Sequence, residues 1–323
     1  MVTARGKSAR GSSGYRDLGR RLSDKAKRRG PIRLTPADTV FNVIMYAALA
    51  FVLIIVAYPL IFVLSASFSE PYAVISGQVW LYPVRFSTVG YTTIFRDAGL
   101  MRTFLNSVHV TALGTAINLM CTVMAAYPLS VKTFVGRGVF MGILSFTMFF
   151  GGGLIPFFLL VRNLGLYNTY WALVLPGAIS VYNVIVARTF FSTSIPYELY
   201  EAAELDGCSD IYYLIRVVLP LSAPILAVLV MYYAVGHWNA YFNHMIFLKD
   251  KAKFTFQITL RSILIQNQNS DMMIDASVLQ RQQGLADLLK YSLIVVSSTP
   301  MLLLYPFIQK HFVKGVMVGA IKG

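Results

Sequence analysis

The sequence predicts an all-α membrane protein with six transmembrane helices and a cytoplasmic helix–turn–helix between the fourth and fifth. The first reason is composition, because 56% of the 323 residues are hydrophobic and 13% are charged, against about 25% charged residues in a soluble domain. The mean hydropathy is +0.62. The second reason is that long stretches lack Asp, Glu, Lys and Arg, and each approaches the roughly 20 residues that a helix needs to cross a bilayer. The expected spans are 39–67, 103–129, 138–161, 168–190, 219–247 and 288–309.

Two other classes of fold are excluded by the same stretches. Helices of a soluble core need a polar face at helical period, and these stretches are apolar nearly all round. Transmembrane β-strands are about 10 residues long and alternate apolar with polar residues, which these stretches do not. We therefore expect a six-helix membrane domain over residues 39–323.

The N-terminal 38 residues form a basic tail. They hold 11 Lys or Arg and three acidic residues, a composition that buries too little apolar surface to fold alone. The tail lacks the short apolar core of a signal peptide, so we expect it to remain attached. Anionic lipids of the membrane surface are its expected partner, and nucleic acid is not, although the formal net charge is +14.

The distribution of basic residues predicts the orientation. Placing both termini in the cytoplasm puts 18 Lys or Arg on the inner side and 10 on the outer side. Cytoplasmic segments carry the excess of basic residues in membrane proteins. We therefore expect a multi-pass protein of the plasma membrane with both termini in the cytoplasm.

A short acidic segment follows the fourth expected span. Five of the 14 acidic residues lie between Glu198 and Asp210. A helix is expected from about Pro196 to Leu205, Gly207 suits the positive φ that ends a helix, and Ser209 or Asp210 can cap a second helix. The segment is a candidate docking surface, and its charges fit equally an interfacial amphipathic hairpin without a partner.

The order of residues in this segment resembles the EAA loop of ABC importer permeases. The chain reads Glu201-Ala202-Ala203, then Asp206-Gly207, and ends on Leu219-Pro220. The resemblance implies that this loop docks into two cytoplasmic ATPase subunits. In that arrangement Glu201 pairs with basic residues, Ala202 and Ala203 allow close packing, and Gly207 makes the turn.

The resemblance also implies the subunits and cofactors of the complex. The chain has no complete phosphate loop, so ATP and Mg are expected on the partner ATPase and no cofactor on this chain. Six spans are half of the usual path, so a second and different permease subunit is expected. An extracytoplasmic solute-binding protein is the remaining expected partner.

A second region is similar to carbohydrate-type permeases of the maltose class in bacteria. It contains Trp238-Asn239 followed by Tyr241, and the stretches 148–176 and 258–268 are similar to a branch with lipoprotein-anchored binding proteins. The likeness covers residues 35–323 and implies an oligosaccharide cargo. Aromatic rings and amides suit sugars, so Trp238, Asn239 and Tyr241 are candidate path residues, although an aromatic belt at the membrane interface fits their position as well.

Glycine and proline interrupt the third expected span. The candidate hinge residues are Gly151, Gly152, Gly153 and Pro156. Broken helices allow movement in transporters, but these residues are also common in membrane helices generally. Both interpretations stay open.

Three other functions are alternatives to a carbohydrate permease. A secondary transporter commonly carries charged residues within its spans, and the long apolar stretches here, 39–69, 103–131, 138–161, 163–187, 217–248 and 291–309, contain none. A membrane enzyme needs clustered catalytic or metal-binding side chains, and we predict no catalytic residue and no metal site. An ABC permease for peptides or amino acids shares the acidic loop, so that only the region around Trp238 and the third-span likeness separate it from a sugar permease.

Overall fold

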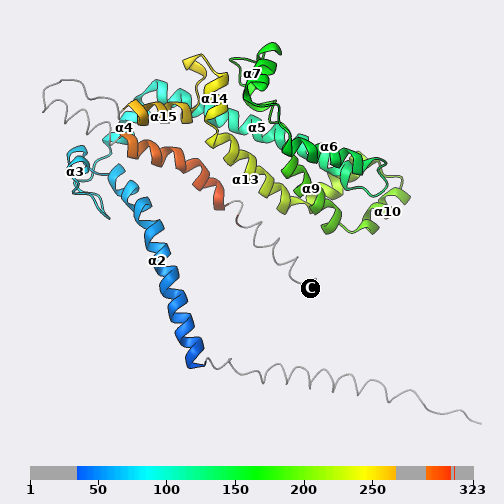
Figure 1. Cartoon of the computed structure of the whole chain (residues 1–323), viewed down its shortest axis with the longest axis horizontal. Coiled ribbons are helices and arrows are strands. Elements are labelled where there is room, and N and C mark those ends of the chain that lie inside the picture. The colour runs from blue at the N-terminus through cyan, green and yellow to red at the C-terminus, as the bar shows by residue number, and fades with distance from the viewer. Residues whose placement is uncertain (1–34, 267–288, 307–308, 310–323) are drawn as a thin grey trace, which may run out of the picture. The chain divides into compact units, whose positions relative to one another are not determined.

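The computed structural model describes residues 35–266, 289–306 and 309 (Figure 1), and its described residues contain helices and no strand. The all-α class predicted from the sequence is therefore confirmed. Residues 1–34, which are most of the predicted basic tail, lie outside the described residues. The acidic and basic residues between 267 and 288 lie outside them as well.

Helix α2 (Pro36–Ser67) begins three residues before the predicted span. Its start is fixed by a reciprocal cap, in which the Thr35 N–H donates to an Asp38 carboxylate oxygen (2.9 Å) and the Asp38 N–H donates to the Thr35 hydroxyl (3.2 Å). Residues 36–38 therefore belong to the helix rather than to the tail. The chain divides into two units after Pro59, so the first unit contains the N-terminal part of α2.

The second unit, from Leu60 onward, begins with the end of α2 and two short helices, α3 (Pro71–Ile75) and α4 (Val89–Arg96). The long helix α5 (Ala98–Ser130) follows and covers the second predicted span with a few residues to spare. Asp97 caps it by accepting a hydrogen bond from the Leu100 N–H at 2.9 Å.

The third and fourth predicted spans are each interrupted. The third consists of α6 (Arg137–Phe149) and α7 (Leu154–Asn163), which meet at 114°. Three of the four residues in the break are the glycines 151–153, and Pro156 lies in the first turn of α7, where proline is tolerated. The fourth consists of α8 (Trp171–Val174) and α9 (Val181–Ser194), with Pro176 and Gly177 between them. Ser180 caps α9.

The remaining helices complete the described chain. They are α10 (Tyr197–Leu205), α11 (Asp210–Tyr213), a π-helix η1 (Leu214–Val218), α12 (Leu219–Leu221), α13 (Ala223–Asn239), α14 (Phe242–Phe247), the 3₁₀ turn η2 (Lys251–Lys253), α15 (Phe256–Gln266) and a helix over residues 289–306. The fifth predicted span, 219–247, is therefore divided at Ser222 and again at residues 240–241.

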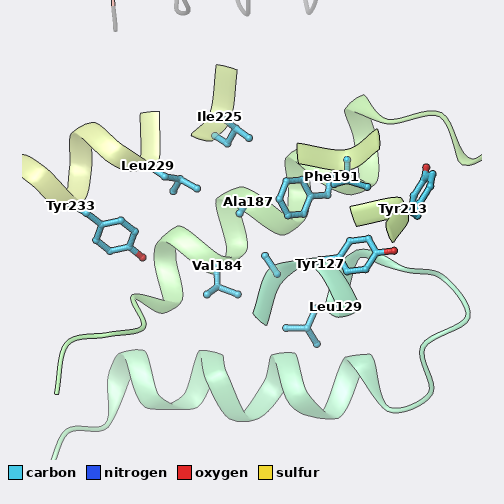
Figure 2. Packing of buried hydrophobic residues seen from close by; sticks show 11 residues of the cluster. Tyr127, Leu129, Val184, Ala187, Phe191, Tyr213, Ile225, Leu229 and Tyr233 are labelled. Carbon is cyan, nitrogen blue, oxygen red and sulfur yellow. The ribbon is translucent and has the colours of Figure 1, made fainter. Parts of the chain in front are cut away.

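Helices α5, α9 and α13 lie side by side and form the main packing contact of the second unit (Figure 1). Figure 2 shows their buried side chains meeting, with Val184 and Ala187 from α9 and Leu229 from α13 all fully buried. In a bilayer such helices are held together by close packing rather than by removal of apolar surface from water. This core holds the segment that follows α9.

By length and composition, two described helices suit a membrane crossing. They are α2 and α5. Two bent pairs, α6 with α7 and Asp210–Leu221 with α13, raise the number to four if each pair forms one crossing. The second bend measures 83° and falls at Ser222, between Pro220 and Pro224. Proline at 224 cannot donate to the carbonyl four residues earlier, which weakens the helix at this point.

Candidate functional site

The 196–222 segment is a helix–turn–helix whose turn is defined by backbone hydrogen bonds. After α10, the Gly207 N–H donates to the Glu204 carbonyl (3.0 Å) and the Cys208 N–H donates to the Ala203 carbonyl (2.9 Å). This pair of bonds is the Schellman motif, which needs a left-handed residue just after the helix. Gly207 has φ +72° and supplies it. The predicted turn at Gly207 is confirmed.

The second helix of the segment begins at the predicted cap. The Ser209 hydroxyl accepts a hydrogen bond from the Tyr212 N–H at 3.4 Å, and α11 runs directly into the π-helix η1. A π-helix holds one residue more than an α-helical turn and is found often at functional sites. Leu219 and Pro220 then lie in α12, immediately before the 83° bend.

The inner face of the segment is fastened to the core of the second unit. Tyr213 and Val218 are buried there, and Ala203 and Cys208 pack against the same cluster. Figure 2 shows Tyr213 beside Tyr127 and Phe191, which come from α5 and α9. Ala203 therefore packs inward against its own chain. Of the two alanines proposed for close contact with a partner, only Ala202 is exposed.

A tyrosine links the two helices of the segment. The Tyr200 hydroxyl donates to the Asp210 carboxylate at 3.3 Å. Burial raises the pKa of Tyr200, and the negative charges of Asp210 and Glu204 raise it further. The hydroxyl therefore stays protonated at neutral pH and keeps its donor role. This bond holds α10 against α11 across the Gly207 turn.

The outer face of the segment combines free carboxylates with exposed apolar side chains. Leu205 is 89% exposed and Ile211 is 72% exposed. Glu201 is exposed as well. Within the described residues the single ion pair joins Arg85 to Glu70. The exposed carboxylates Glu201, Glu204 and Asp206 therefore have no cationic partner in the described part of the chain.

The structure places Trp238 in the core rather than on a path. It is 2% exposed, its indole N–H donates to the Ser297 carbonyl at 2.8 Å, and its ring meets Phe104 edge to face. A buried indole normally finds such a partner. Trp238 thus fastens α13 to the helix over 289–306 and to α5, and its place on the path stays a prediction.

The two other candidate path residues are accessible. Asn239 ends α13 and is exposed, and Tyr241 is half-buried in the link to α14. The Arg261 guanidinium lies 4.2 Å from the centre of the Tyr241 ring. An aromatic ring beside a guanidinium can stack on a sugar ring and bind a negatively charged group.

A line of polar residues on α5 was not predicted as part of the site. The Asn118 amide oxygen accepts a hydrogen bond from the His237 Nε2–H at 3.1 Å, and the Asn118 amide N–H donates to the Gly177 carbonyl at 2.7 Å. This network joins α5 to α13 and to the α8–α9 link. The signal in the sequence was polar residues recurring every three or four positions in an apolar helix. They are Ser107, Thr111, Thr115, Asn118 and Thr122.

Metal-binding side chains are not grouped in the described ranges, where no three of His, Cys, Asp and Glu lie together. The Gly151–Gly153 break lies between α6 and α7, and Pro156 lies in the first turn of α7. Movement at this break stays a prediction.

Comparison with known proteins identifies the family. No family model matches the chain. It is 40% identical over 287 residues to the polygalacturonan/rhamnogalacturonan transport system permease protein YtcP of Bacillus subtilis (strain 168), which covers 88% of this chain and 99% of that protein.

Two solved structures are similar in fold. One is a chain of a bacterial ABC transporter involved in the import of the acidic polysaccharide alginate, with 30% identity, a TM-score of 0.79, and coverage of 88% of this chain and 100% of that chain. The other belongs to an alginate transporter in complex with a pentasaccharide-bound periplasmic protein. Its TM-score is 0.50 and its identity is 15%, with coverage of 84% and 93%, so it supports the fold alone.

These relatives are permease subunits rather than enzymes, and the likeness to YtcP extends over nearly the whole of that protein. The chain accordingly belongs to the carbohydrate permeases of ATP-binding-cassette importers, which are helical proteins of the membrane.

Proposed function

We propose that the 196–222 segment is the coupling element of an ATP-driven oligosaccharide importer, and that this chain lines half of its path. The observation that carries the proposal is the outer face of that segment. It presents unpaired carboxylates beside Leu205 and Ile211, both largely exposed. A surface with these properties suits a cleft that is apolar at its centre and basic at its rim.

The contacts of the 196–222 segment explain how its displacement reaches the core of the second unit. The Schellman turn and the bond between Tyr200 and Asp210 hold the two helices together. Tyr213 and Val218 then connect them to the core formed by α5, α9 and α13. Closure of an ATPase dimer that grips the outer face moves this core as one body, because packed interiors transmit displacement.

The rest of the assembly follows from the proposed coupling. Two cytoplasmic ATPase subunits bind ATP and Mg, and a second, different permease subunit completes the path. An extracytoplasmic, lipoprotein-anchored binding protein delivers the sugar. The charge-free stretches support six crossings with both termini in the cytoplasm, the broken α8–α9 pair and the helix over 289–306 supplying the fourth and sixth.

An acidic oligosaccharide is the favoured cargo. The relatives YtcP, named for galacturonate polymers, and the alginate transporter share 40% and 30% identity with this chain. Several relatives at 28% identity or lower are named for neutral sugars such as arabinooligosaccharides. The Arg261 guanidinium over Tyr241 has no carboxylate within ion-pair distance in the described ranges, so it can receive a uronate carboxylate.

Uptake by the complete transporter in proteoliposomes tests the cargo. We expect a labelled galacturonate oligosaccharide to be imported with ATP, and an excess of neutral arabinooligosaccharide not to compete. Arg261→Gln is expected to raise the apparent KM for the acidic sugar about tenfold, since a charged hydrogen bond is worth roughly 1.5–3 kcal/mol. Arg96→Gln, which removes an exposed charge at the end of α4, is the control. Equal competition by the neutral sugar would show that the cargo is not acidic.

Charge reversal at Glu201 tests the coupling role. Glu201→Lys is expected to lower ATP-driven uptake by more than about tenfold with normal membrane insertion, because facing like charges across an interface costs several kcal/mol. Glu201→Gln, which removes the charge without reversing it, should have a smaller effect. Uptake and co-purification of the ATPase subunits are measured together. Normal uptake by the Glu201→Lys protein contradicts the docking role of this face.

A further inference from the structure

A cavity of about 530 Å³ lies behind the 196–222 segment, between the end of α5, the link to α6, the end of α9 and the start of α10. Its lining includes the cations Lys132, Arg137 and Arg188 and the apolar side chains of Phe191, Ile195 and Val218. A water molecule occupies about 30 Å³ of liquid, so the cavity has room for a group much larger than a single phosphate ion.

The positive charge of the cavity is not neutralised by the chain. Glu198 is the one carboxylate among the lining residues, which leaves an excess of two positive charges. None of the three cations forms an ion pair in the described part of the chain, where the only such pair is far along the sequence at Arg85. Lys132 instead lies 4.4 Å from the centre of the Tyr197 ring.

The two arginines that line the cavity are not fully solvated surface charges. Both side chains are half-buried. The Arg188 Nε–H donates to the Leu129 carbonyl at 2.9 Å, which fixes the plane of its guanidinium at the end of α5. Partial burial of a guanidinium without a counter-ion is unfavourable, and its planar set of donors matches the oxygens of a phosphate. The cavity therefore suits an anion.

The mixed lining of the cavity defines the chemistry of that anion. A free ion would use only the basic side chains and leave the aliphatic and aromatic side chains of the lining against water. An amphiphile with a phosphate head uses both. The cavity sits where the link after α5 and the end of α9 reach the membrane surface in the proposed topology, and basic pockets at such positions bind anionic headgroups.

We infer that this cavity binds the phosphate of an anionic phospholipid, with Arg137 and Arg188 on the phosphate oxygens and Lys132 at the entrance. The inference rests on the orientation and coupling role proposed above. A lipid held there lies against Tyr197 and Tyr200, at the base of the coupling helix α10. It thus supports the joint through which movement of the segment reaches α5 and α9.

Lipid retention by the complete purified transporter tests this inference. The probe is phosphatidylglycerol in mixed micelles with phosphatidylcholine, and the retained lipid is measured by native mass spectrometry. The double substitution Lys132→Gln and Arg137→Gln is expected to lower phosphatidylglycerol retention roughly 25-fold, at about fivefold for each lost cation. Arg188 is left in place because it also holds the Leu129 carbonyl.

Arg216→Gln is the matched control, since Arg216 is an exposed arginine of the same segment and does not line the cavity. Its phosphatidylglycerol retention is expected to equal that of the unchanged protein. Equal retention by the double variant, or preferential retention of phosphatidylcholine, overturns the inference.

Two further arms separate the lipid from other anions. If millimolar inorganic phosphate displaces the retained lipid completely, the site is one for a free anion and the lipid assignment is wrong. If the lipid is held by the permease pair but expelled when the ATPase subunits bind, a protein side chain occupies the cavity and the assignment is again wrong. Retention unchanged by Glu201→Lys separates this site from the coupling proposal, because that variant tests docking alone.

Discussion

Replacing Gly207 with proline is expected to abolish ATP-driven uptake while the chain still reaches the membrane. Gly207 adopts φ +72° and its N–H donates to the Glu204 carbonyl. Proline fixes φ near −65° and has no N–H, so both the turn and one of its two hydrogen bonds are lost. The chain then leaves α10 in another direction, and the position of α11 relative to α10 changes. Uptake, ATP hydrolysis and membrane insertion are measured on the same preparation.

The backbone conformation, and not the space around the glycine, is the cause of this expectation. A Cβ atom at Gly207 would meet nothing within 4 Å. Asparagine tolerates a positive φ better than other residues, so Gly207→Asn is expected to retain most of the uptake, whereas a β-branched residue is not. If proline and asparagine at this position give the same uptake, the turn does not determine coupling.

Replacing Gly114 with leucine is expected to prevent correct packing of α5 against α13. A Cβ atom at Gly114 would lie 2.5 Å from the His237 Nε2 atom and 2.7 Å from its Cδ2 atom. The ring is held by its hydrogen bond to Asn118, which is itself bonded to the Gly177 carbonyl. Overpacking of this kind costs about 1–3 kcal/mol or more. We expect a lower Tm and a reduced yield of assembled transporter.

Gly142→Leu is the matched control, because Gly142 lies in α6 and an added Cβ would meet nothing within 4 Å. Its Tm is expected to stay close to that of the unchanged protein. The double variant Gly114→Leu with His237→Ala should recover part of the loss, since the two residues are in contact and their effects are not additive. A Gly114→Leu protein as stable as the Gly142→Leu protein contradicts the proposed contact.

The sequence predicted best what is determined by local interactions. The Gly207 turn and the Ser209 cap each depend on residues at most four positions away, and such bonds give the same signature in any fold. The α6–α7 break was visible for the same reason, since three successive glycines cannot continue a helix cheaply.

The role of Trp238 could not be predicted because its partner is distant in sequence. The indole N–H binds the carbonyl of Ser297, 59 residues later, and nothing near Trp238 indicates that pairing. Ala203 is a similar case, since it packs against a cluster whose members include distant residues of α5, α9 and α13. Whether a side chain in a membrane protein faces its own chain, a partner or the path is decided by tertiary packing.

The bend at Ser222 was missed although its signal was present. The predicted span 219–247 treated two prolines four residues apart, Pro220 and Pro224, as tolerable in one helix. The structure instead places the bend between them. Because Pro220 and Pro224 have no backbone N–H, the helix lacks two of its backbone hydrogen bonds there, and a bend is expected at this point.

The π-helix η1 determines how α11 is rotated about the helix axis relative to the helices that follow it. Each residue of an α-helix turns the chain by about 100°, and η1 contains its additional residue between Ile211 on the docking face and α13. Deletion of that one residue would rotate the docking face by about 100° around the helix axis relative to α13. In the proposed coupling, this one residue therefore determines the direction in which a displacement caused by the ATPase reaches α13.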